Sequence, residues 1–151
     1  MRTVVQRVAR AEVRVGDEVI GRIERGILLL VGVEKGDGEA DADVTARKIA
    51  ALRIHAGRTP MDVTTADAGG ACLVISQFTL CASLAKGNRP SFEPAEEPAR
   101  AQQLYLRVAQ GLRDAGLAVE TGRFGADMAV ALVNDGPVTF IVESRAGALV
   151  K

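Results

Sequence analysis

The chain has 151 residues, 48% hydrophobic and 25% charged, and its basic and acidic side chains balance to a formal net charge of zero. These values are typical of one globular domain, and they argue against a protein that coats nucleic acid through its overall field, though not against one that grips a short end with a local patch. We expect no signal peptide and no membrane helix, because no apolar run approaches about 18 residues, and therefore a cytoplasmic protein.

The first third of the chain is predicted to form a β-meander. Short strands are expected at residues 3–8 (TVVQRV), 11–15 (AEVRV) and 19–23 (VIGRI). Residues 26–33 (GILLLVGV) are apolar on both faces, which predicts a central strand. A helix that Asp41 or Asp43 would cap should follow and end near Leu52.

The rest of the chain is predicted to combine further strands with one long helix. Strands are expected at residues 71–80 (ACLVISQFTL), 117–122 (LAVETG), 128–134 (MAVALVN) and 137–143 (PVTFIVE). The helix should span residues 96–115, with a buried stripe of Leu104, Val108 and Leu112, and residues 145–151 should form a tail. The pattern predicts a single α+β domain with a mixed sheet over residues 1–151.

The sequence contains few of the side chains on which conventional catalysis depends. The only histidine, His55, follows the first helix in an irregular segment, where we expect a satisfied or solvated surface histidine rather than a catalytic base. Cys72 and Cys81 fit no metal or redox spacing and are expected to be buried, reduced thiols. We therefore expect no metal and no cofactor, and an enzyme of this sequence would depend on backbone groups, a hydroxyl or its substrate.

Two stretches are chemically unusual. Residues 76–79 (SQFT) place polar groups at the end of a buried strand. They are either polar side chains that alternate outward, or a strand end whose amides and Thr79 hydroxyl face a pocket. Residues 134–139 (NDGPVT) separate two apolar runs with turn-forming residues, and Pro137 removes a backbone donor at the mouth of a strand.

Taken together, these segments resemble the D-aminoacyl-tRNA deacylase family, also called D-tyrosyl-tRNA deacylases, over nearly the whole chain. The matching stretches are, in order, MRTVVQRV, GILLLVGVEKGD, KIAALRI, SQFTL, KGNRPSF, ETGRFGADM and VNDGPVT. The resemblance implies an enzyme that hydrolyses the ester of D-amino acids, and of glycine, mischarged onto tRNA. It also implies a compact β-barrel-like sheet flanked by two main helices, and a homodimer with its active sites at the subunit interface.

The resemblance also implies how the two unusual stretches act. In the family pattern the Gly136–Pro137 peptide bond is cis, and the loop of one subunit enters the partner's pocket, where its carbonyls bind the substrate's amino group and exclude an L side chain. The implied catalytic residues are Ser76, Gln77, Phe78 and Thr79. Amides around Phe78 and Thr79 would stabilise the oxyanion. The attacking group is either a water molecule assisted by the terminal ribose 2′-hydroxyl or Thr79 as a nucleophile.

Further residues are assigned supporting roles by the same resemblance. Those expected to hold the loop are Arg7, Asn134 and Thr139. An ordinary surface charge explains Arg7 equally well, and an ordinary core role explains Met128 and Phe124, which would otherwise line the adenosine end of the pocket. Lys86 and Arg89 would supply a phosphate-binding patch. Residues 81–84 (CASL) depart from the aromatic and acidic residues common in relatives, so their role stays open.

Two rival functions are compatible with the sequence. One is a small hydrolase of the same fold that acts on free D-amino acid esters or N-acyl compounds. The other is a non-catalytic RNA-binding module. The balanced charge and the 3% of aromatic residues argue against the second, because base-stacking surfaces need rings.

Overall fold

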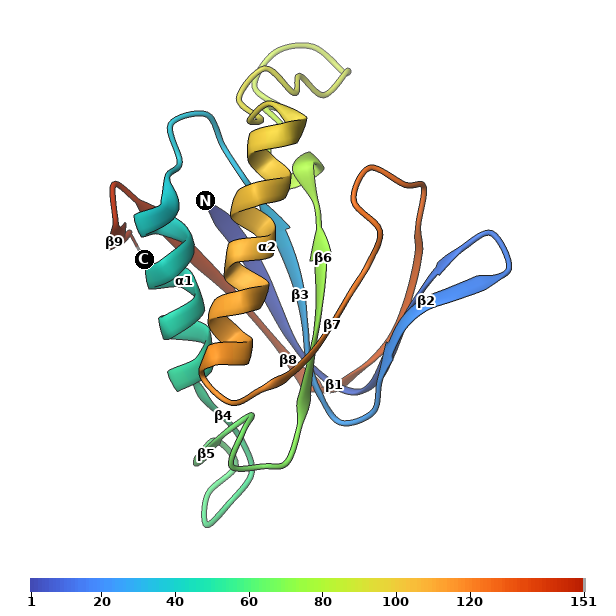
Figure 1. Cartoon of the computed structure of the whole chain (residues 1–151), viewed down its shortest axis with the longest axis vertical. Helices are drawn as coiled ribbons and strands as arrows, with labels where there is room; N and C mark the ends of the chain where they lie inside the picture. The colour runs from blue at the N-terminus through green and yellow to red at the C-terminus, as the bar shows by residue number, and fades with distance from the viewer. Residues whose placement is uncertain (151) are drawn as a thin grey trace.

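A computed structural model describes residues 1–150, and its main feature is a curled mixed sheet that two helices cover on one face (Figure 1). The strands of this sheet are β1 (Arg2–Val15), β2 (Glu18–Ile23), β3 (Gly26–Gly32), β6 (Ala71–Ser76), β7 (Ala118–Thr121), β8 (Ala129–Arg145) and β9 (Ala148–Leu149). Their order is β7-β6-β3-β1-β8-β9, with β2 paired to β1. Strands β3, β6 and β7 run parallel to one another, whereas β1 is antiparallel to β2, β3 and β8. The predicted α+β class is confirmed.

The helices α1 (Glu39–Ala51) and α2 (Pro98–Asp114) pack side by side on the sheet (Figure 1). The predicted stripe of α2 is fully buried, since Leu104, Val108 and Leu112 expose at most 1% of their surface. These side chains share one apolar core with residues of β3 and β6. A smaller core lies where β2 and the first half of β8 pack near β1, β3 and β6. No helix within residues 1–150 has the length and apolar character needed to cross a bilayer.

Strand β1 is one continuous strand of 14 residues where two short strands were predicted. It stays continuous because partners accompany it throughout: β3 pairs with its first half, β2 with its second half, and β8 runs along its other edge. The predicted meander therefore becomes one long strand with two shorter neighbours.

The two final predicted strands are likewise joined into one, β8, which passes through the NDGP stretch without reversing direction. Asn134 pairs with Val8 and Thr139 pairs with Gln6, so four residues on β8, 135–138, lie opposite the single residue Arg7 on β1. This geometry is a wide bulge rather than a hairpin turn. A hairpin would have required the two halves of β8 to pair with each other.

Helix α1 and the chain end also differ from expectation. Gly38 is the N-cap of α1, and Asp41 lies inside the first turn, where its carboxylate accepts a 2.9 Å hydrogen bond from the Gly38 amide. Residues 145–149 are not a loose tail, because β9 pairs with the end of β8 and the Gly147 amide donates to Asp41 at 2.9 Å. The last residue of the predicted tail, 151, lies outside the described residues.

Both cysteines are buried and unpaired with each other, as predicted. Burial raises the pKa of the Cys72 thiol to about 12 and that of the Cys81 thiol to about 11. Both thiols are therefore protonated at neutral pH and unreactive as nucleophiles.

Candidate functional site

Residues 76–79 form a sharp exit from the sheet. Strand β6 ends at Ser76, earlier than predicted, and the short 3-10 helix η1 (Phe78–Cys81) follows. Gly32 on β3 makes room for this turn, because a side chain there would meet Leu80, the Cys81 sulfur and the Gln77 carbonyl at about 3 Å. As the first residues of a helix, Phe78 and Thr79 carry backbone amides with no acceptor inside it.

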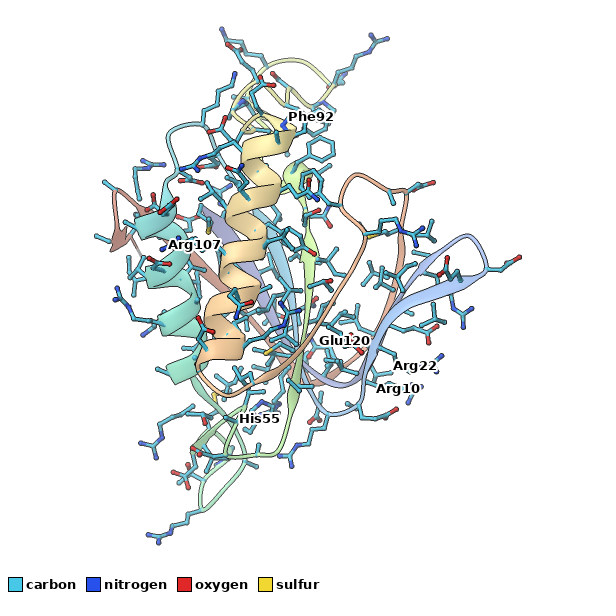
Figure 2. The ribbon with its side chains drawn as sticks, viewed as in Figure 1. Arg10, Arg22, His55, Phe92, Arg107 and Glu120 are labelled. Atoms are coloured by element: carbon cyan, nitrogen blue, oxygen red, sulfur yellow. The ribbon has the colours of Figure 1, made fainter. Side chains whose placement is uncertain are left out.

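The Thr79 hydroxyl is engaged on one side only. The Gln77 side-chain amide donates a hydrogen bond to the Thr79 hydroxyl oxygen, which leaves the Thr79 proton free to be donated elsewhere. No histidine accompanies it, because His55 lies at the opposite end of the molecule from the region of η1 and Phe92 (Figure 2). Within residues 1–150 there is also no cluster of His, Cys, Asp or Glu side chains that could hold a metal ion.

Two cavities flank the turn and share Ser76, Gln77, Phe78 and Gly125 as walls. The first has a volume of about 260 Å³ and is largely apolar. Its other walls are Val31, Val33, Ala95, Glu96, Pro98, Ala101, Tyr105 and Phe124. The second has a volume of about 240 Å³ and extends along residues 126–128 to Ile75 and Val130. The SQFT turn is thus a partition with a partly open cavity on each side.

Phe124 and Met128 each line one of these cavities. Phe124 belongs to the first cavity and its ring lies 6.0 Å from that of Tyr105, while Met128 belongs to the second. Both also pack against the hydrophobic cores, so each is a core residue and a cavity wall at once. Gly122 makes this arrangement possible, because a side chain there would meet the Met128 sulfur at 2.8 Å.

The wide bulge of β8 is fixed by side-chain contacts on both flanks. The side-chain oxygen Oδ1 of Asn134 accepts a 2.7 Å hydrogen bond from the Val138 amide, and the side-chain Nδ2 of Asn134 donates to the Thr139 hydroxyl at 3.0 Å. The Gly136–Pro137 peptide bond inside the bulge is cis, and Gly136 has a φ of +141°, which favours glycine.

Arg7 holds the same bulge from the neighbouring strand. Its Nε donates to the Asp135 carbonyl at 2.9 Å, and its Nη1 donates to the Ile54 carbonyl at 2.7 Å. Ile54 belongs to the short strand β4 (Arg53–His55), which pairs with β5 (Val63–Thr64). Arg7 is therefore a bridge between the bulge and the β4–β5 hairpin, and not a free surface charge.

The predicted site residues fall into two separate groups. Ser76, Gln77 and Phe78 share cavity walls with Phe124 and Met128, whereas Thr79, the next residue on η1, lines neither cavity. Arg7, Asn134 and Thr139 lie with Gly136 and Pro137. Neither Gly136 nor Pro137 lines either of the cavities beside the turn. Lys86 and Arg89 lie on an exposed loop between η1 and α2, and neither forms an ion pair with another of residues 1–150.

His55 is buried, which corrects the expectation of a surface histidine. It exposes 1% of its surface, its Nε2 lies 3.0 Å from the Thr65 hydroxyl, and its Nδ1 has no partner within residues 1–150. Burial, reinforced by the positive charges of Arg25 and Arg7, lowers the pKa of the ring. It is therefore neutral at pH 7 and has a structural position beneath the Arg7 bridge.

Sequence reasoning assigned no site role to several cavity-lining residues, among them Tyr105 and Glu96. Tyr105 is 2% exposed, and its position beside the apolar stripe of α2 was the only signal it gave. Glu96 is the only charged wall of the first cavity, and its carboxylate also accepts the Glu97 amide at 2.8 Å. Gly125 has a φ of +75° and lines both cavities.

The chain is similar to known proteins over nearly its whole length. A family model described as D-Tyr-tRNA(Tyr) deacylase matches residues 4–143. A protein of Anaeromyxobacter dehalogenans named D-aminoacyl-tRNA deacylase is 55% identical over 148 residues, covering 96% of this chain and 98% of the relative. One of the same name from Paracoccus denitrificans is 53% identical over 145 residues, covering 95% and 97%.

Solved structures agree on the fold. A structure titled c-Myc DNA Unwinding Element Binding Protein superposes with a TM-score of 0.89 at 38% identity, covering 97% of this chain and 100% of that one. A structure described as a probable eukaryotic D-amino acid tRNA deacylase superposes with a TM-score of 0.77 at 16% identity, covering 93% and 97%, and supports the fold alone.

Proposed function

Because the chain belongs to the D-Tyr-tRNA(Tyr) deacylase family, we infer that it is a D-aminoacyl-tRNA deacylase, a hydrolase that removes D-amino acids from tRNA. The observation that carries this conclusion is the 55% identity to a relative of that name across 96% of the chain. We further propose that it also releases glycine, that it rejects L-aminoacyl esters, and that it acts in the cytoplasm, where tRNA is charged.

The two cavities beside the SQFT turn suit the 3′ end of an aminoacyl-tRNA. The first, walled by Phe124 and Tyr105, offers a largely apolar space of about 260 Å³ for the terminal adenine. The second, beside Met128, takes the ribose and the aminoacyl group. The ester bond then lies at the partition between the two spaces, over residues 76–79.

At this partition the backbone carries out most of the chemistry. The amides of Phe78 and Thr79 donate to the developing oxyanion, an interaction that is usually the largest single contribution to the rate. A water molecule attacks the carbonyl carbon, the bond to the ribose 3′-oxygen breaks, and the 2′-hydroxyl relays the water's proton to that oxygen. The Thr79 hydroxyl orients the ester or the water. Its oxygen already accepts from Gln77 and has no base beside it, which disfavours Thr79 as the nucleophile.

Chirality selection is assigned to the Gly136–Pro137 bulge of a second subunit. Within one chain this bulge lines neither cavity, although Arg7 and Asn134 hold it firmly. Beside it, the large apolar residues Val133, Phe140 and Ile141 of β8 are 39%, 38% and 58% exposed, which suits a homodimer interface. Backbone carbonyls placed there bind the amino group and reject an L side chain of any kind, while glycine passes because it has none.

The decisive experiment compares D-Tyr-tRNA with L-Tyr-tRNA and the free D-Tyr methyl ester. We expect the D-aminoacyl-tRNA to be deacylated at least about a hundredfold faster than the L form, and the free ester to react slowly. Equal rates on the free ester would support the small-molecule hydrolase instead. Binding without any cleavage above the buffer rate would support an RNA-binding module. A single-chain mass in solution would contradict the homodimer.

A further inference from the structure

The aromatic side chains of this protein are few and unevenly distributed. The chain has four Phe and one Tyr; Phe78, Tyr105 and Phe124 line the first cavity, and Phe92 contacts Phe78. Tyr105 and Phe124 stand inside it. Phe78 stands at its edge, and the ring of Phe92 lies 5.0 Å from that of Phe78. Figure 2 places Phe92 at the N-terminal end of α2, next to the end of β6.

The two outer rings remain accessible. Phe78 is 56% exposed and Phe92 is 40% exposed, although each is large and apolar. Their planes meet at 64°, an edge-to-face contact, so the two rings do not cover each other's faces. A pair of exposed rings at the mouth of a cavity is an unusual arrangement for a surface that only faces water.

The loop next to these rings is positively charged and closed at its base. Residues 84–90 contain Lys86 and Arg89 and no acidic residue. The loop is tied by two backbone hydrogen bonds between Ser83 and Ser91, of 2.8 and 3.0 Å. Because Phe92 directly follows this tie, the rings and the two cations belong to one local surface.

We propose that Phe78 and Phe92 form a stacking surface for the base of the nucleotide that precedes the terminal adenosine, with Lys86 and Arg89 bound to the adjoining phosphates. The proposal rests on the deacylase function given above and adds a second nucleotide subsite to it. Rings that present free faces bind unpaired bases of any sequence, and cations beside them bind the backbone that connects the bases. The low aromatic content therefore does not argue against RNA binding, because the rings are concentrated where the RNA end must lie.

The test uses three short substrates that carry D-Tyr on the terminal ribose: adenosine, the dinucleotide CpA, and a CpA analogue without the cytosine base. We expect kcat/KM to be about tenfold higher for CpA than for adenosine, since one stacked base contributes this order of affinity. The abasic analogue should lose most of that advantage while keeping its phosphate. Phe92→Ala and Phe92→Leu should lower the CpA-to-adenosine ratio to about that of the abasic analogue, whereas Phe92→Trp should preserve it.

Leu106→Ala is the matched control. Leu106 is 43% exposed on α2 and lines neither cavity, so this variant should keep the wild-type ratio. Equal values for CpA and the abasic analogue, or an unchanged ratio in Phe92→Ala, would overturn the stacking proposal and leave the deacylase function standing. Failure to cleave any of the three esters, or D-Tyr-tRNA, would instead overturn the deacylase function itself. Coverage of both rings by a second subunit would also overturn the stacking proposal.

Discussion

The SQFT turn and the Gly136–Pro137 bulge both interrupt the sheet, but they do so in opposite ways. At the turn, β6 stops, the chain leaves the sheet, and two cavities open beside exposed side chains. At the bulge, β8 continues on both sides, no cavity is lined, and Arg7 and Asn134 fix the backbone. The first region offers space and free amides, and the second offers a rigid shape.

This difference indicates how an enzyme without a histidine base could work. Space and amides are sufficient for hydrolysis only if the substrate supplies a proton relay, and a rigid shape is useful only if it reaches a pocket. In one chain the two regions do not share a cavity, so the proposed function requires the second subunit to bring them together. The turn and the bulge can therefore be perturbed separately, each with its own control.

The largest effect is expected from the substrate at the turn. Replacing the terminal adenosine of D-Tyr-tRNA by its 2′-deoxy form removes the proposed proton relay and should lower the single-turnover rate by about a thousandfold. Thr79→Ala should lower it less than about tenfold, because only one neutral hydrogen bond is lost. If Thr79→Ala abolished turnover and the deoxy substrate reacted normally, Thr79 would be the nucleophile.

The next effect is expected at the bulge. A side chain added by Gly136→Ala would meet the Val138 side chain at 2.6 Å and Arg7 Nη2 at 3.1 Å, at a φ of +141°. Such strain costs about 1–3 kcal/mol, so kcat/KM for D-Tyr-tRNA should fall by up to about a hundredfold. The matched control is Gly16→Ala, which also has a positive φ, +57°, but no neighbour within 4 Å. Equal losses of activity in both variants would show that the bulge has no specific role in catalysis.

The sequence predicted regular elements well where periodicity is local. The unbroken apolar run of β3 and the stripe of α2 identified a central strand and a buried helix face, and both are confirmed. The exit of β6 at Ser76 was missed because the cause, the absence of a side chain at Gly32, lies on another strand. After Ser76, the apolar residues Phe78 and Leu80 alternate with Gln77 and Thr79, which continues the pattern of a strand.

The bulge and His55 were also misjudged because their structure depends on contacts with distant parts of the chain. The residues Asn, Asp, Gly and Pro occur in hairpin turns and in bulges alike. Only the pairing of Asn134 with Val8 and of Thr139 with Gln6 shows that this stretch is a bulge. A single histidine has no periodicity at all, so the burial of His55 depended on where β4 packs. The role of the bulge came from resemblance, whereas composition alone left it as a turn. The resemblance assigned no role to His55, and its burial is seen only in the structure.

The smallest effect is expected from pH, and it should arise at the bulge rather than at the turn. His55 lies beside Ile54, whose carbonyl holds Arg7, and the charged groups that act on the ring are Arg25, Arg7 and Asp135. Its pKa is lowered in the fold, mainly by burial. As pH falls below about 6.5, the unfolded chain therefore binds a proton that the folded chain resists, and the free energy of unfolding decreases.

The measurement is urea unfolding of the wild type and of His55→Gln between about pH 7 and 5.5, above the range in which most carboxylates titrate. His55 is the only histidine, so the difference between the two slopes isolates it. The wild type should lose stability with a slope of at most about 1.4 kcal/mol per pH unit, and the variant should be nearly flat. Parallel slopes would mean that His55 is not held neutral, and that the support of the Arg7 bridge is insensitive to its protonation.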